Sequence, residues 1–187
     1  IVELEDGIVL VATNGQGVFR LDMAENRLSL FAGAAGGEYA LGSSSVLTIL
    51  RDRAGSIWLG TSDAGLYNIG ISGELRQYRS LTDSLSGEQL DLADVYDVLE
   101  SSDGRIFLAT GYGIAALDGS KKDIVSVPIR GHSFGTSRIA SIMEDDSGLL
   151  WAGGYSGVFI GFRTNIETLN SETGLPNENI LSVARVP

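Results

Sequence analysis

Few residues of this chain could perform acid–base or nucleophilic chemistry. His132 is the single histidine and cysteine is absent, which excludes thiol catalysis, cysteine zinc sites and multi-histidine metal centres. The stretch after Gly153, Gly154-Tyr-Ser-Gly-Val158, lacks the final glycine of a nucleophile elbow. Gly15 and Gly17 begin like a dinucleotide-binding fingerprint, but its third glycine is missing. The sequence therefore predicts a protein that is not an enzyme and holds no cofactor.

The densest run of carboxylates is Glu144-Asp145-Asp146. Paired carboxylates can hydrolyse a glycosidic bond, and clustered ones can bind a cation. The run falls in a turn of a sequence repeat, in which other copies carry Asp52 and Asp103. Aspartate side chains accept hydrogen bonds from the backbone of such turns. We interpret the run as turn chemistry and predict no metal site.

Composition limits the classes of partner. The 187 residues include 25 Gly, are 43% hydrophobic and carry a formal net charge of -11. This apolar fraction is too high for a disordered chain, and the acidic balance argues against nucleic acids and anionic lipid surfaces as partners. No apolar stretch reaches the roughly 18 residues of a membrane-spanning helix, and the first residues lack the basic region of a signal peptide.

Paired glycines mark a repeat. The first glycines of four copies, separated by 48, 49 and 44 residues, are Gly7, Gly55, Gly104 and Gly148. A second glycine follows each after nine or ten residues, at 17, 65, 113 and 157, and a short apolar run precedes each first glycine. A period in the mid-forties is that of a four-stranded propeller blade. The first strand of each blade is expected at 1–4, 46–50, 95–99 and 139–143, and the second at 57–61 and its equivalents. The third strand is expected at 17–21, 65–69, 113–117 and 157–162, and the fourth at 27–31, 74–78, 124–127 and 166–169.

The pattern of apolar residues fits stacked blades. Inner strands covered on both faces should be continuously apolar, as in Ile57-Trp58-Leu59. Trp58 and Trp151 take the same place in their copies, which predicts core positions. The fourth strand should be a half-exposed edge, and residues 74–78 alternate accordingly. Residues 91–102 also have helical spacing, but their alignment with the other copies favours a strand.

We therefore predict an all-β fold, a β-propeller segment of about four four-stranded antiparallel blades. The expected blades span about 1–45, 46–92, 93–138 and 139–179, and the innermost strand of a fifth blade occupies 180–187.

In a propeller, the turns between second and third strands and the connections to the next blade surround one mouth of the central channel. Function concentrates on such loops. They carry a mixture of aromatic rings, amides and carboxylates, which suits a sugar with apolar ring faces and many hydroxyls. One connection carries a longer insert at 83–91. The predicted ligand-binding residues are Asn14, Tyr39, Asp63, Tyr112, His132, Phe134 and Tyr155.

The copies resemble the two-component regulator propeller repeat, whose units read I-x-x-I-x-x-D-x-x-G-x-L-W-I-G-T-x-x-G-G-L. The match is strongest over Val46–Tyr67 and nearly as good over Ile139–Phe159. Residues 174–180, Gly-Leu-Pro-Asn-Glu-Asn-Ile, resemble the family's connector G-L-P-x-N-x-I. The first and third copies depart from the pattern, with Leu10 and Phe107 in place of the tryptophan.

The resemblance implies a seven-bladed ring, of which this chain is a segment. It also implies the periplasmic sensor region of a bacterial membrane receptor, with a histidine kinase or cyclic-dinucleotide output and glycan-derived ligands. The alternatives are a protein–protein interaction scaffold and a polysaccharide lyase or hydrolase acting through Tyr112 or Asp63. An open segment leaves unpaired edges, so we expect the rest of the propeller or a second chain, as in a homodimer, to cover them.

Overall fold

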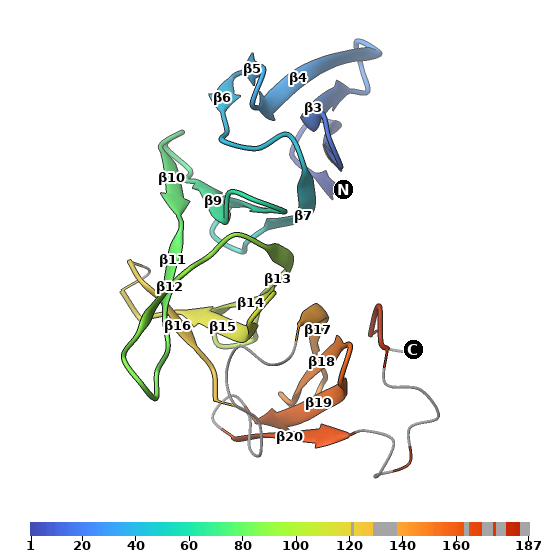
Figure 1. Cartoon of the computed structure of the whole chain (residues 1–187). Coiled ribbons are helices and arrows are strands. Elements are labelled where there is room, and N and C mark those ends of the chain that lie inside the picture. Colours follow the sequence, from blue (N-terminus) through green and yellow to red (C-terminus); the bar gives the residue numbers. More distant parts are fainter. Residues whose placement is uncertain (121, 129–137, 163–164, 170–173, 175–178, 184–187) are drawn as a thin grey trace. The chain divides into compact units, whose positions relative to one another are not determined.

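The computed structural model describes residues 1–120, 122–128, 138–162, 165–169, 174 and 179–183. These residues form strands and turns but no helix, so none of them lies in a helix that could cross a membrane. The chain divides into two compact units, Ile1–Arg79 with Ala93–Val95, and Ser80–Leu92 with Tyr96–Pro187 (Figure 1). The all-β prediction is confirmed.

The first unit contains two sheets. The first sheet is ordered β1 (Val2–Glu3), β2 (Ile8–Thr13), β3 (Gly17–Asp22), β4 (Arg27–Gly33) and β6 (Tyr39–Ala40), with β5 (Gly36–Gly37) in the connection before β6. The second sheet is ordered β7 (Val46–Arg51), β8 (Ile57–Thr61), β9 (Leu66–Ile69) and β10 (Leu75–Tyr78). Neighbouring strands are antiparallel, except that β6 runs parallel to β4.

These two sheets share one hydrophobic core. It includes Leu10 and Val18 from the first sheet and Leu59 and Tyr67 from the second. All five residues of β8 are buried, as expected for a strand covered on both faces. The face opposite Leu59 carries Gly60, where a Cβ would lie 2.7 Å from the carbonyl oxygen of Val95. Glycine at this point allows the backbone to approach closely.

The second unit also contains two sheets. The larger is ordered β13 (Val95–Glu100), β14 (Ile106–Thr110), β15 (Gly113–Leu117), β16 (Ile124–Ser126), β11 (Ser80–Thr82) and β12 (Gln89–Asp91). The other is ordered β17 (Ile139–Glu144), β18 (Leu150–Gly154), β19 (Gly157–Phe162) and β20 (Asn165–Leu169). Their common core includes Phe107, Ala109, Ile139, Ala152 and Phe159. The four sheets confirm the propeller-segment prediction, and β13 confirms a strand rather than a helix within 91–102.

The insert at 83–91 differs from the loop that we expected. It belongs to a hairpin, because β11 pairs antiparallel with β12 and parallel with β16 at Thr82 and Val125. Leu81 is buried. The Ser126 hydroxyl donates to the Asp83 carboxylate at 2.9 Å and accepts from the Ser84 amide at 2.8 Å. Buried apolar surface and satisfied polar groups together hold the hairpin on the sheet, so β16 is not the edge.

The outer strands also depart from the expected alternation. In β10 the residues Leu75 to Gln77 are exposed and only Tyr78 is buried, where its ring lies 6.2 Å from that of Trp58. In β4 the first three residues are exposed and the last three are buried, where β6 covers them. Which residues of these strands are buried therefore depends on the segments that cover each end of the strand, and not on a two-residue alternation.

Candidate functional site

The turns between second and third strands are built alike in three sheets. The hydroxyls of Thr13, Thr61 and Thr110 each donate to the carbonyl oxygen of a glycine at the far side of the turn, at 2.8, 2.8 and 2.9 Å. The fourth sheet has Gly154 at this position. Such side-chain bonds close a tight turn and fix its conformation.

Backbone hydrogen bonds fasten these turns to the linkers that precede the innermost strands. In the first unit the amide of Gly17 donates to Ser44 at 2.6 Å, and that of Ser62 donates to Ser45 at 3.1 Å. In the second unit the amide of Tyr155 donates to Arg138 at 3.3 Å. We call the turns and linkers joined in this way the turn rim of each unit. A rim held by backbone bonds presents its side chains from a fixed scaffold.

The first unit brings two predicted site residues together on its turn rim. Asn14 is exposed and forms a β-bridge with Ser45. Asp63 is exposed in the β8–β9 turn, next to Ser62, which bonds to the same serine. A carboxylate and an amide therefore flank one linker, where both can bond to sugar hydroxyls.

Tyr39 does not join them. It lies in β6, and its ring packs edge-on against Phe31 with the ring centroids 5.2 Å apart. Its hydroxyl lies 3.3 Å from where a Cβ on Gly73 would be, in the β9–β10 turn at the opposite end of β9 from Asp63. Burial and the neighbouring Glu38 raise the pKa of Tyr39. Its surroundings are those of a residue that packs between two hairpins.

In the second unit, Tyr112 is half-buried in the β14–β15 turn, where its amide donates to the Thr110 hydroxyl at 3.1 Å. Tyr155 lies in the β18–β19 turn with 48% of its surface exposed. His132 and Phe134, the other two predicted residues, lie outside the described residues.

The most distinctive arrangement on this rim centres on Arg138, which precedes β17. Its guanidinium carbon lies 3.9 Å from the centre of the Tyr96 ring and 5.0 Å from that of Tyr155. Its Nε is buried and has no hydrogen-bond partner among the described residues. A buried donor without a partner costs free energy, whereas a cation between two aromatic faces is stabilised by them. The arrangement offers a ligand the exposed ring of Tyr155, which lies against this cation.

Arg138 and Tyr96 were missed by the sequence-based prediction. The residue before the innermost strand is Ser45, Asp94 and Asn179 in the other copies, so Arg138 is the one basic residue at that position. That contrast was a usable signal. The pairing with Tyr96 could not be recognised in the sequence, because it joins residues 42 positions apart through the stacking of two sheets.

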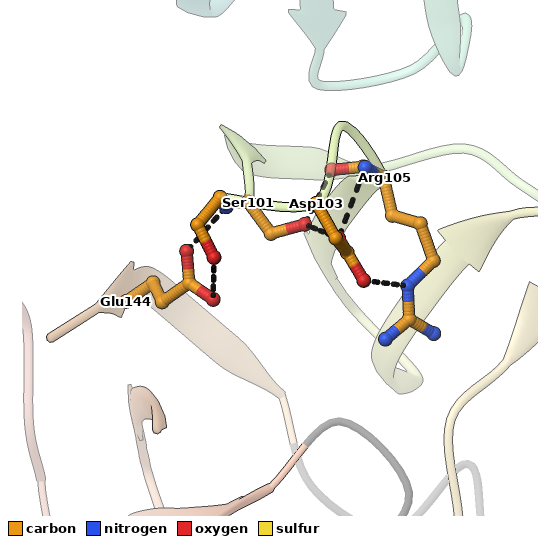
Figure 2. A network of polar contacts seen from close by, with 5 residues as sticks. Ser101, Asp103, Arg105 and Glu144 are labelled. Atoms are coloured by element: carbon orange, nitrogen blue, oxygen red, sulfur yellow. Dashed lines mark hydrogen bonds and ion pairs between the residues drawn. The ribbon is translucent and has the colours of Figure 1, made fainter. Parts of the chain in front are cut away.

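The carboxylate run is used within the structure, as the turn interpretation predicted. Asp145 accepts from the amides of Ser147 and Leu149 at 2.8 and 3.0 Å and from Nε1 of Trp151 at 2.8 Å. Glu144 accepts from the amide and the hydroxyl of Ser102 on the neighbouring sheet (Figure 2). These carboxylates fix turns and join sheets. No three His, Asp or Glu side chains within the described residues are placed to hold a metal ion.

Asp52 and Asp103 both accept a backbone amide in their turns, from Ser56 at 2.8 Å and Arg105 at 3.3 Å, but they occupy different positions of the turn. Asp52 accepts from Nε1 of Trp58 at 2.9 Å, as Asp145 does from Trp151. The corresponding residue of the third copy is Ser101, whose hydroxyl donates to Asp103, which also pairs with Arg105 (Figure 2). Phe107 replaces the tryptophan there and has no N–H to be satisfied.

The comparison with protein families matches part of these repeats. Residues 40–63 match the model of the two-component regulator propeller family. The matched segment is similar to a repeat of that family. It covers the linker before β7, the β7–β8 hairpin and the following turn, which include the Asp52–Trp58 pair. The comparison with curated proteins found no match to this chain.

Solved structures share the fold. The extracellular domain of BT4673, a proposed hybrid two-component system of B. thetaiotaomicron, superposes with a TM-score of 0.71 and 21% identity, over 96% of this chain and 23% of its own. PorZ, a surface component of the type-IX secretion system of Porphyromonas gingivalis, gives 0.71 and 13%, over 95% and 28%. A catalytically inactive virginiamycin B lyase from Staphylococcus aureus gives 0.61 and 13%, over 94% and 59%.

These similarities show a segment of a β-propeller. The chain spans about a quarter of the length of the first of these structures. The three proteins are described as the extracellular domain of a two-component system, a secretion component and a lyase, so the fold alone does not determine a function.

Proposed function

We propose that this chain is a non-catalytic, ligand-binding segment of the extracytoplasmic sensor propeller of a bacterial membrane receptor. The family repeat at 40–63 and the likeness to a sensor's extracellular domain support the receptor assignment. The rest of the propeller, or a second copy, covers the open edges of the segment. Binding would bias the receptor's output by favouring one arrangement of the propeller over another.

The Arg138 site is the observation that carries the binding function. Its guanidinium lies against two tyrosine rings on a turn rim, and one of these rings is 48% exposed. Aromatic faces stack on the apolar faces of sugars, and guanidinium N–H groups donate to hydroxyls. A glycan-derived ligand fits both groups.

The use of the carboxylates supports a non-catalytic role. Among the described residues, Asp52, Asp145 and Glu144 each accept hydrogen bonds from the protein itself. A catalytic acid must instead face the substrate with its proton available. Asp63 is exposed on the turn rim of the first unit, whereas Tyr112 belongs to the second unit.

The test is a thermal-shift screen with a panel of oligosaccharides. A ligand at 100 times its Kd raises the free energy of unfolding by about 2.7 kcal/mol. We expect Tyr155→Ala to abolish the shift and Arg27→Ala, at an exposed position of β4 outside both turn rims, to leave it unchanged. The absence of a shift across a broad panel would refute the glycan assignment, and turnover of any polysaccharide would refute the non-catalytic one.

A second candidate function is docking of a protein partner. Exposed apolar side chains occur on two hairpins of the first unit, with Met23 and Leu28 on β3–β4 and Ile71 and Leu75 on β9–β10. Exposed apolar patches mark interaction surfaces. Crosslinking within the whole receptor, with and without Ile71→Asp, tests this function, because loss of a specific crosslink in the variant would support docking at these hairpins.

A further inference from the structure

A cavity of about 380 Å³ lies in the first unit, away from the turn rim. Its apolar wall is formed by Leu4, Ile8, Phe31 and Ile57. Arg20, Arg51, Glu5 and Glu38 provide its charged groups, and Gly55 completes the lining. The volume falls within the range typical of small-molecule sites.

The sequence explains why the sheets leave space here. The second and fourth copies place an aspartate and a tryptophan at two corresponding positions, as in Asp52 with Trp58. The first copy has Leu4 and Leu10 at these positions. Leucine is smaller than tryptophan, and Leu4 lines the cavity. The seam between the first two sheets, which an indole ring would fill, is therefore only partly filled.

Arg20 is the unusual residue of this seam. It pairs in register with the buried Leu10, so its side chain leaves the sheet on the face that packs against the second sheet. The corresponding residues of the other copies are Asn68, Ala116 and Ile160, none of which is charged. A cation at this position needs compensation when it is removed from water.

Two of the other three charged groups of the cavity pair with each other. Nη2 of Arg51 donates to Glu5 at 3.0 Å. The exposed Glu38 carboxylate lies near the Tyr39 hydroxyl, whose pKa it helps to raise. The Arg20 side chain has no ion pair or hydrogen bond within the part of the chain that the structure describes. The cavity therefore presents one guanidinium that is unpaired among the described residues, that of Arg20, beside its apolar wall, and the exposed Glu38 carboxylate at its margin.

We propose that this cavity binds a small organic acid with an apolar body, whose carboxylate pairs with Arg20 and whose body packs against Phe31, Ile8 and Ile57. Guanidinium and carboxylate form a bidentate, charge-assisted pair. The apolar wall contributes through burial of the ligand's hydrocarbon surface. The proposal is independent of the glycan site, because none of the cavity residues belongs to a turn rim.

The experiment compares 4-phenylbutyrate with 4-phenylbutyramide, which has the same hydrocarbon body without the charge. The purified chain is titrated with each probe to about 10 mM, the range of weak small-ligand affinities, and followed by amide chemical shifts and calorimetry. We expect the acid to bind at least about tenfold more tightly than the amide, with shifts at Ile8, Phe31 and Ile57. Equal binding of the two probes, or no shift at these residues, would overturn the proposal.

Two variants locate the interaction. Arg20→Gln should weaken binding of the acid at least about tenfold, whereas Arg27→Gln, which removes an exposed arginine paired with Glu25, should not. The double substitution Leu4→Asp with Leu10→Trp restores the pair of the other copies and should abolish binding by filling the cavity. Circular dichroism verifies the fold of each variant. Retention of binding in a folded double variant would contradict the proposal, even if Arg20→Gln did not fold.

Discussion

At the scale of single residues, the repeats carry a matched pair. The aspartate three residues before the first glycine and the tryptophan three residues after it occur together in the second and fourth copies, joined through Nε1. Where the tryptophan becomes Phe107 or Leu10, the aspartate becomes Ser101 or Leu4. A buried carboxylate is tolerated only when donors satisfy it, so the two positions must change together.

This pairing predicts a thermodynamic coupling. Asp52 is buried, and Trp58→Phe would remove one of its donors, so we expect a loss of roughly 2–3 kcal/mol in the free energy of unfolding. Adding Asp52→Ser, which recreates the pair of the third copy, should recover part of that loss, with a coupling energy of about 1–3 kcal/mol. Urea unfolding of the four proteins measures it. Additive effects of the two substitutions would contradict the pairing.

Asp118 provides a pH-dependent prediction at the same scale. Hydrogen bonds from the Ser120 hydroxyl and the amides of Asp123 and Lys122 lower the pKa of Asp118 from 3.8 to about 2. The folded pKa lies below the unfolded one, so the carboxylate contributes its full stability above pH 3.8 and loses it as pH falls toward 2.

Carbon-detected NMR titration of the Asp118 carboxyl should therefore give a midpoint near 2. Ser120→Ala should move this midpoint upward, because it removes the largest of the lowering contributions. A midpoint near the ordinary value of 3.8 in the unmodified protein would show that the turn does not hold this geometry in solution.

At the scale of elements, the β11–β12 hairpin changes which strand is the edge of its sheet. Its attachment depends on Leu81 and on the polar cluster of Asp83, Ser84 and Ser126. Ser126 is buried and contacts both other members of the cluster. The hairpin covers β16, a strand that would otherwise present unpaired backbone groups.

Removal of this attachment should free the hairpin without unfolding the sheet. Ser126→Ala deletes the hydroxyl that bonds Asp83 and Ser84, each bond worth about 1 kcal/mol. We expect hydrogen exchange in β11 and β12 to accelerate by about tenfold, with little change in β14 and β15. Ser120→Ala, in the β15–β16 turn of the same sheet, is the control. Uniform acceleration across the sheet would contradict a separately attached hairpin.

The hairpin also shows what sequence reasoning could and could not reach. The glycine period located the strands of all four sheets, because each turn requires a residue that tolerates its backbone conformation. The hairpin was not predicted, since it lies outside the repeat and its parallel pairing joins Thr82 to Val125. The Arg138 site was found only in part for the same reason. Tyr155 lies in a turn, whereas its partner Tyr96 comes from another sheet.

At the scale of the whole molecule, stability should be distributed among neighbouring sheets rather than shared by one core. Each unit has its own hydrophobic cluster. In the first unit, Val95 lies against Gly60. In the last sheet of the series, Ile180 and Val183 lie against Gly153 in the same way. Trp151, on the same strand as Gly153, is only half-buried, whereas Trp58 is buried. Coverage of a sheet thus depends on its immediate neighbour, as in repeat proteins.

Asp97 tests this nearest-neighbour view. Its carboxylate accepts from its own strand at the Val98 amide, and from β17 at the Ser141 hydroxyl and the Ile142 amide, at 2.9, 3.1 and 3.0 Å. Hydrogen bonds to a charged group contribute about 1.5–3 kcal/mol, so Asp97→Ala should accelerate hydrogen exchange in β17 and β18 by more than tenfold.

Exchange in β7 to β9 should stay unchanged, because these strands belong to the other unit. Asp63 is exposed in a turn of that unit, so Asp63→Ala should alter hydrogen exchange in neither region. If Asp97→Ala accelerated exchange equally in both units, the chain would unfold as a single cooperative block. The stability of each sheet would then reflect the whole array instead of its neighbours, because global opening would expose all strands together.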